Sequence, residues 1–190
     1  MILRALFLLS TCLLAAEPTP DCFTQHAKLG RGLNLGNALE GPTEGAWGRK
    51  LEDADFSRIK AAGFDSVRIP VRWSAHAQTT NPYAIDPTWM ARVDHVVKAC
   101  LEAKLTVVLN VHHYDEMDQA PAEHRERFAA LWRQIAGHFA DFPDELQFEL
   151  YNEPNTKHTA ADWNLNLAAA LKEVRRTNPT RAVQVGGVEW

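Results

Sequence analysis

The chain has 190 residues, of which 46% are hydrophobic, and its formal net charge is -4. This length is sufficient for one domain with a hydrophobic core, and the mild negative charge provides no basic surface for a nucleic acid. We therefore expect no nucleic-acid partner, and a neutral partner is a better candidate than a phosphate polymer.

The first sixteen residues have the organisation of a secretory signal peptide. Arg4 gives a short basic start, residues 5–14 form an apolar run, and two alanines end the segment. The run is too short to span a bilayer comfortably, and the polar, Pro-broken segment EPTPD follows directly. A buried N-terminal helix is the alternative. We predict a signal peptide over 1–16, a lead-in segment over 17–30, and a secreted protein, extracellular or periplasmic, with no membrane attachment after signal removal.

From residue 31 onward, predicted strands and helices alternate. Apolar segments bounded by turn residues predict strands over 32–36, 65–71, 105–113, 145–152 and 182–187. Apolar residues at the 3.6-residue spacing predict helices around Phe56 and Ile59, from Met90 to Leu101, from Phe128 to Phe139, and from Trp163 to Leu171. The third strand is apolar almost throughout, as expected of a parallel strand buried on both faces.

Five strands alternating with four helices predict a parallel α/β fold. Two architectures fit this order, an open doubly wound sheet and a (β/α)8 barrel. No G-x-G-x-x-G follows the first strand. Polar residues instead stand at or near the ends of successive strands: Arg68, His112, Asn152 and Glu153. Because such a distribution is typical of a barrel site, we predict that residues 31–190 form part of a (β/α)8 barrel.

Two cysteines remain after the predicted signal peptide, Cys22 and Cys100. Export permits a disulfide between them. Cys100 shares the apolar face of a predicted helix with Val93, Val96 and Val97, which favours a buried free thiol. Sequence alone does not set the separation of two cysteines, so a bridge stays open.

The stretch FELYNEPN places a carboxylate at the end of a strand. The proline after Glu153 has no N–H and biases Glu153 toward an extended backbone. Strand alternation puts Glu149, Tyr151 and Glu153 on one face, the barrel interior, and Asn152 on the other. A solvated loop charge is the alternative for Glu153. However, Asn152 beside it can hydrogen-bond a substrate hydroxyl, so we place Glu153 at the centre of the candidate site.

The adjacent histidines His112 and His113 end the third strand. Neighbours on a strand point to opposite faces, and neither HExxH nor CxxC occurs, so we expect no metal. Asn110 shares the inward face with His112, which favours a hydrogen-bonding role for His112 toward substrate. His113 is either a second substrate contact or a cap of the strand.

One arginine and several tryptophans complete the candidate set. Arg68 lies between apolar neighbours in VRIPV, where an arginine requires an anion. A carboxylate in the same barrel is its natural partner, and an arginine extending to the rim is the alternative.

Three tryptophans fall in loops or at strand ends, and each is either core or a surface on which a sugar ring stacks: Trp47, Trp73 and Trp190.

Four stretches together resemble glycoside hydrolase family 5, the cellulase family: GLNLGNALE, FDSVRIPVRWSAH, LNVHHYDE and FELYNEPN. They occur in the family's order with matching gaps, and the resemblance extends from about Leu29 to Trp190. The NALE and HHY variants are similar to the endoglucanase and mannanase branch. The resemblance implies a retaining endo-β-1,4-glycan hydrolase that acts as a monomer on a β-linked polysaccharide and needs no cofactor.

The resemblance also implies roles for individual residues. Glu153 would be the general acid/base, Asn152 would contact the sugar hydroxyl beside the scissile bond, and Arg68 would hydrogen-bond the nucleophilic carboxylate. Further residues would bind substrate: Asn37, Glu40, His112, His113 and Trp190.

The chain departs from the family pattern in one large respect. A retaining mechanism needs a second carboxylate as nucleophile, which in this family ends the seventh strand, whereas we predict five strands. Eight strands with their helices typically need about 250 residues. The chain is therefore expected to be the N-terminal part of a longer product and to be inactive alone.

Two other functions remain to be weighed. A non-catalytic carbohydrate-binding remnant is the chief alternative, and a barrel-type metal hydrolase would need a ligand spacing that is not found. Cellulose, mannan, xyloglucan and mixed-linkage glucan are not distinguished by the sequence.

Overall fold

A computed structural model describes residues 21–189. The predicted signal peptide and Trp190 lie outside the described residues.

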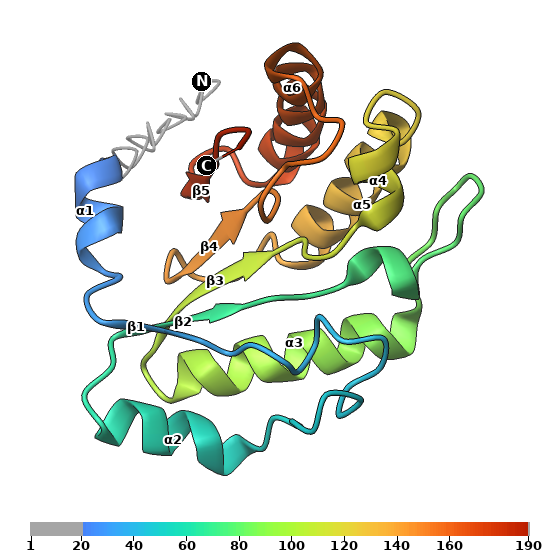
Figure 1. The fold of residues 1–190 in the computed structure, drawn as a ribbon. Coiled ribbons are helices and arrows are strands. Elements are labelled where there is room, and N and C mark those ends of the chain that lie inside the picture. Colours follow the sequence, from blue (N-terminus) through green and yellow to red (C-terminus); the bar gives the residue numbers. More distant parts are fainter. Residues whose placement is uncertain (1–20, 190) are drawn as a thin grey trace, which may run out of the picture.

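The strands form one parallel sheet in the order β1-β2-β3-β4-β5 (Figure 1). Their bounds are β1 (Gly32–Asn34), β2 (Ser66–Ile69), β3 (Thr106–Asn110), β4 (Leu146–Glu149) and β5 (Val183–Gln184). Each strand pairs with the next one along the chain. A doubly wound sheet reverses its strand order at a switch point, and this sheet does not. The architecture is therefore part of a (β/α)8 barrel, as predicted.

The main helices follow the strands in alternation (Figure 1). They are α2 (Asp53–Ala61), α3 (Pro87–Glu102), α5 (Arg125–His138) and α6 (Ala160–Thr177), and all were predicted from their apolar spacing. Shorter helices were not predicted: α1 (Cys22–Ala27), the 3-10 helix η1 (Trp73–His76) and α4 (Asp115–Gln119). One or two turns are too short to show a helical period.

Helix α3 illustrates how local sequence specifies these elements. Asp86 caps its N-terminus by accepting from the backbone N–H groups of Thr88 and Trp89, at 2.7 and 3.1 Å, and Pro87 occupies the first turn. Cys100 is buried on the sheet side, and burial raises the pKa of its thiol to about 12. It is a free thiol, as is the exposed Cys22.

The sheet has an apolar outer face and a polar inner face. Val67, Val107 and Phe148 are buried beneath the helices, because alternate strand residues point to the same side. Arg68 and Glu149, on the opposite side, contact each other across the sheet. No helix among residues 21–189 is long and apolar enough to cross a bilayer.

The end of β4 differs from the predicted one. The strand stops at Glu149, and Tyr151 is buried against Phe128 and Trp163 of the helix layer. The prediction that Tyr151 faces the barrel interior is therefore wrong, as is the prediction that Asn152 lies on the opposite face from Glu149. Alternation holds only while the strand pleat continues, and the pleat ends before both residues.

Candidate active site

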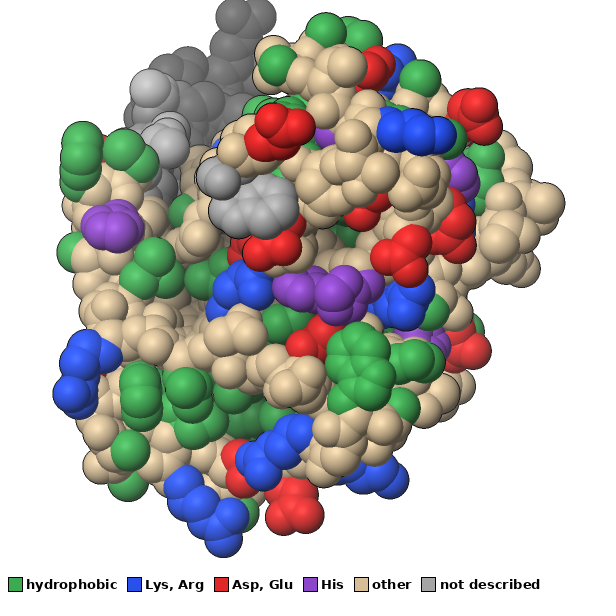
Figure 2. All heavy atoms as spheres, in the orientation of Figure 1, with side chains coloured by type: hydrophobic (Ala, Val, Ile, Leu, Met, Phe, Trp, Pro, Cys, Tyr) green, Lys and Arg blue, Asp and Glu red, His purple; other side chains and the backbone are tan. Residues whose placement is uncertain are grey.

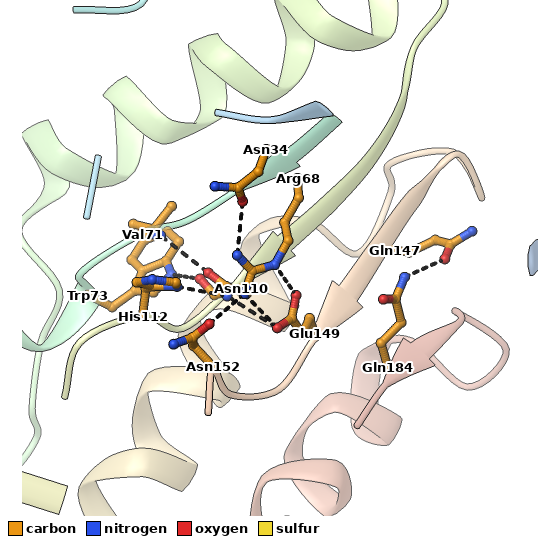
Figure 3. A network of polar contacts seen from close by, with 10 residues as sticks. All are labelled: Asn34, Arg68, Val71, Trp73, Asn110, His112, Gln147, Glu149, Asn152 and Gln184. Carbon is orange, nitrogen blue, oxygen red and sulfur yellow. Dashed lines mark hydrogen bonds and ion pairs between the residues drawn. The ribbon is translucent and has the colours of Figure 1, made fainter. Parts of the chain in front are cut away.

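Arg68 of β2 is the centre of a polar network at the strand ends (Figure 3). Its Nε donates to Glu149 Oε2 at 2.6 Å and its Nη2 to Glu149 Oε1 at 2.8 Å. Nη2 also donates to Asn152 Oδ1 at 2.8 Å, and Nη1 donates to Asn34 Oδ1 at 2.9 Å. The network thus joins β1, β2, β4 and the segment after β4. Arg68 has the carboxylate partner that its sequence environment predicts, and the partner is Glu149.

The donors of Arg68 are not all used. Both N–H groups of Nη2 have acceptors, whereas Nη1 has a pair of N–H groups and, among residues 21–189, only Asn34 as a partner. Since a guanidinium binds carboxylates through such N–H groups, Arg68 can accommodate one further acceptor without breaking its bonds to Glu149.

His112 is held in one protonation state and one tautomer. Burial, followed by the proximity of His113 and Arg68, lowers the pKa of His112 to about 3, so the ring is neutral near neutral pH. The Asn110 amide, whose nitrogen can only donate, lies 3.2 Å from His112 Nδ1. Nδ1 therefore accepts, and the ring proton lies on Nε2, where it is available as a hydrogen-bond donor.

The tryptophans named from the sequence have different environments. Trp73 is fully buried, and its Nε1 donates to Asn110 O at 2.9 Å, so it is a core residue. Trp47 is 45% exposed and lies edge-on to His113, with ring centroids 5.8 Å apart. His113 in turn lies edge-on to His112, at 4.5 Å between centroids. Trp47 thus joins the surface formed by the two histidines.

Glu153 is exposed and lies in a loop after β4 that has an unusual backbone. Its φ is 30°, so the prediction of an extended conformation is wrong. The bias that a following proline imposes is overcome by the loop contacts, including the Asn155 side chain, whose Nδ2 donates to Glu153 O at 2.8 Å. Glu153 lines a polar hollow of about 390 Å³ together with His113, Asp115 and Asn152.

Glu40 and Asn37 lie in the loop after β1. Glu40 is buried, at 4% exposure, and its carboxylate accepts from the backbone N–H groups of Asn37 and, at 3.0 Å, Ala38. A Cβ on Gly36 would lie 2.9 Å from Asn34 Nδ2 and 3.4 Å from Glu40 Oε1. Glycine therefore permits a close approach that places Glu40 beside Asn34, a partner of Arg68.

The structure brings most of the predicted site residues to one region. Figure 2 shows histidine, arginine and acidic side chains gathered at the centre of one face. Trp190 is outside the described residues. Sequence reasoning did not single out Asn34, although a polar residue next to the apolar Leu33 and Leu35 was a usable signal. No group of three or more His, Cys, Asp or Glu within residues 21–189 could hold a metal ion.

Comparisons with known proteins identify one family. The family model described as Cellulase (glycosyl hydrolase family 5) matches residues 30–190. Endoglucanase H of Acetivibrio thermocellus is 41% identical over 170 residues, which cover 90% of this chain and 19% of the relative.

Solved structures show the same likeness. Thermotoga maritima Cel5A in complex with cellobiose has a TM-score of 0.88 and 47% identity, over 90% of this chain and 55% of that one. A Thermotoga maritima Cel5A structure with mannotriose has a TM-score of 0.88 and 46% identity, also over 90% of this chain and 55% of that one. The chain thus spans about half of these solved structures and a smaller share of the curated relative.

Proposed function

The chain belongs to the cellulase family, glycosyl hydrolase family 5, and from that premise we propose that the protein is a retaining endo-β-1,4-glycan hydrolase. The observation that carries the proposal is the convergence of Arg68, Asn152 and His112 next to the Glu153 loop, at the C-terminal ends of β2, β3 and β4. This is the end of a barrel at which active sites are built.

Glu153 is proposed as the general acid/base. Its exposed position in a polar hollow lets it reach a glycosidic oxygen, protonate it, and later, as a carboxylate, activate water. Asn152 is proposed to contact the sugar hydroxyl beside the scissile bond, since its Oδ1 accepts from Arg68 and its Nδ2, which has no acceptor among residues 21–189, can donate.

The retaining mechanism requires a nucleophilic carboxylate about 5–5.5 Å from the acid/base. Glu149 is poorly suited because both of its oxygens accept from Arg68. We propose that a further carboxylate, from a part of the protein outside residues 21–189, attacks the anomeric carbon. The unused N–H on Arg68 Nη1 suits the binding of that group.

A neutral β-linked glycan is the proposed substrate. His112, neutral with its proton on Nε2, is suited to donate to a sugar hydroxyl, and the exposed Trp47 beside His113 offers an aromatic surface. Asn37 and Trp190 are proposed as further sugar contacts. Glu40, which is buried with its carboxylate bonded to the backbone of Asn37 and Ala38, is proposed to hold the loop that carries Asn37. The cellobiose and mannotriose complexes of the solved relatives support glucan and mannan chains as the substrate class. Secretion by way of residues 1–16 and action as a monomer complete the proposal.

The test replaces Glu153 by Gln in the full-length protein, with Glu123→Gln as an exposed control. Release of reducing sugar from carboxymethylcellulose and glucomannan should fall by a factor on the order of 100 to 10,000. A dinitrophenyl β-cellobioside, whose leaving group needs little protonation, should still react with the nucleophile at nearly the wild-type rate. Near-normal hydrolysis of either polysaccharide by Glu153→Gln would show the assignment to be wrong. A wild type that binds these glycans without cleaving them would favour the carbohydrate-binding alternative.

A further inference from the structure

The loop that carries Glu153 is fastened at both ends to one residue of a different element, Asp118 of α4. The Asp118 side chain is only 16% exposed and lines the same hollow as Glu153. Because α4 begins directly after the segment that contains His112 and His113, contacts of Asp118 connect the loop after β3 with the loop after β4.

Before Glu153, the contact is made through Tyr151. The Tyr151 hydroxyl lies 2.8 Å from Asp118 Oδ1 and 3.2 Å from Tyr114 O. Burial and the nearby Asp118 carboxylate raise the pKa of Tyr151, so the hydroxyl keeps its proton and donates. Tyr151 has little freedom to move, because its ring is packed against Phe128 and Trp163.

After Glu153, two contacts return to the same residue. The Lys157 backbone N–H donates to Asp118 O at 3.1 Å. His158 Nε2 lies 3.3 Å from Asp118 Oδ1, within ion-pair distance although not aligned as a hydrogen bond. The His158 side chain is fully buried, and within residues 21–189 its Nδ1 has no hydrogen-bond partner. A buried polar group of this kind depends on the carboxylate beside it.

The segment between these attachments needs support. Glu153 has a φ of 30°, in a region that residues other than glycine rarely occupy. Such a conformation persists only where the surrounding structure enforces it. Within the loop, Asn155 holds the Glu153 carbonyl at 2.8 Å, and His158 N donates to Asn155 O at 3.0 Å. These bonds fix the loop internally. Asn152 is bonded to Val111 O and Arg68 at the start of the loop, and Asp118 connects both ends of the loop to α4.

We propose that Asp118 is a positioning residue for Glu153, which it holds in place by clamping both ends of loop 151–158. This inference rests on the proposed function of Glu153. A general acid must lie within hydrogen-bond reach of the oxygen that it protonates, and a displacement of about 1 Å can cost on the order of 100-fold in rate. Asp118→Ala removes the side-chain contacts with Tyr151 and His158 and keeps the bond from Lys157 N to the backbone O of residue 118. Loss of the two side-chain contacts should therefore impair the step that needs proton donation more than the binding of substrate.

The experiment compares Asp118→Ala with Asp94→Ala in the full-length protein. Asp94 is a matched control, since it too is 16% exposed and pairs with a histidine, His138, at 2.8 Å. Asp118→Ala should lower kcat on glucomannan at least tenfold with KM changed less than about threefold, and should lower the rate on dinitrophenyl β-cellobioside less than about threefold. An equal loss on both substrates, an effect confined to KM, or a loss no larger than that of Asp94→Ala would overturn the proposal.

A second measurement is independent of activity. Amide hydrogen exchange of residues 152–157, apart from Pro154, which has no N–H, should be at least tenfold faster in Asp118→Ala than in wild type, with Asp94→Ala unchanged there. Unchanged exchange in this loop would overturn the clamp. If Asp118→Ala does not fold, Tyr151→Phe, which removes one hydroxyl only, takes its place with the same criteria. A wild type that cleaves no glycan contradicts the proposed function, and the exchange experiment still decides on the clamp.

Discussion

Two arginine–glutamate pairs in this protein have nearly the same geometry and very different surroundings. Arg68 and Glu149 are joined by bonds of 2.6 and 2.8 Å, and Arg92 and Glu44 by two bonds of 2.8 Å. In both pairs the arginine side chain is 28% exposed and the glutamate side chain 16%. The ion pair itself therefore does not mark one of them as functional.

The difference lies in what else each pair contacts. Arg92 of α3 and Glu44 also bond the backbone of Leu51, through Leu51 O at 2.7 Å and Leu51 N at 3.1 Å, so this pair anchors a loop to a helix. The Arg68 pair instead bonds side chains, Asn34 and Asn152, at the ends of other chain segments. Side chains at the C-terminal ends of parallel strands lie at the end of a barrel where active sites are built, whereas the Leu51 backbone belongs to a loop attached to a helix. From these neighbours we expect a functional role for the Arg68 pair and a structural role for the Arg92 pair.

The largest expected effect separates the two arginines. Arg68→Met in the full-length protein should lower kcat/KM on glucomannan by about 100-fold or more, which corresponds to about 2.7 kcal/mol, because it leaves Glu149 unpaired and releases Asn152. Arg92→Met, measured in the same assay, should stay within about threefold of wild type. Similar small losses in both variants would remove Arg68 from the catalytic set.

Substitution of the two glutamates should show the same contrast in kcat/KM, with a smaller loss at Glu149 than at Arg68. Glu149→Gln places an amide N–H₂ against the Arg68 guanidinium, and we expect Arg68 to shift and kcat/KM to fall by about tenfold. Glu44→Gln should leave kcat/KM unchanged and lower the midpoint of thermal unfolding by a few degrees at most. An activity loss in Glu44→Gln as large as that in Glu149→Gln would contradict the distinction between the pairs.

A third difference concerns the pKa of His112, which burial and, to a smaller extent, Arg68 lower to about 3. Arg68→Met should raise this pKa, although burial keeps it below 6.5, whereas Arg92→Met should not change it. An NMR titration of the His112 ring measures both. A His112 pKa that is the same in Arg68→Met as in wild type would show that the guanidinium does not act on the ring.

The lowered pKa of His112 also has a consequence for stability. In the unfolded chain His112 binds a proton below about pH 6.5, whereas in the folded protein it does so only near pH 3. The unfolded state therefore binds more protons in this interval, so the free energy of unfolding falls as the pH drops from 6.5 toward 3. His112→Asn should reduce this dependence in thermal unfolding measured across the interval.

The smallest expected effect concerns Arg92 and Glu44, whose contribution to the free energy of unfolding depends on pH. The hydrogen bond from Arg92 lowers the pKa of Glu44 below its usual 4.5, so the folded state holds the carboxylate ionised at a pH where the unfolded chain is protonated. The resulting stability is fully present above pH 4.5 and is lost as the pH falls through the folded pKa. Glu44→Gln should remove a contribution of at most about 1 kcal/mol. A slope of unfolding midpoint against pH that is the same in wild type and Glu44→Gln would contradict this.

The sequence by itself determined the fold class and the identity of the main polar residues. The apolar periods predict α2, α3, α5 and α6, and the alternation of strands and helices predicts the parallel sheet. Within β4, period-2 alternation also predicts that Glu149 lies on the inner face, where its carboxylate contacts Arg68 in the structure. These predictions succeed because they depend on repeating local geometry, which a short stretch of residues contains.

Only the tertiary structure decided what happens after each strand ends. The outward position of Tyr151, the inward position of Asn152 and the positive φ of Glu153 all depart from the extrapolated strand. Beyond the last paired residue, backbone direction depends on contacts between distant parts of the chain, such as that of Tyr151 with Asp118, 33 residues away. No local period encodes such contacts, so the loop that carries Glu153 obtains its shape from the packed barrel.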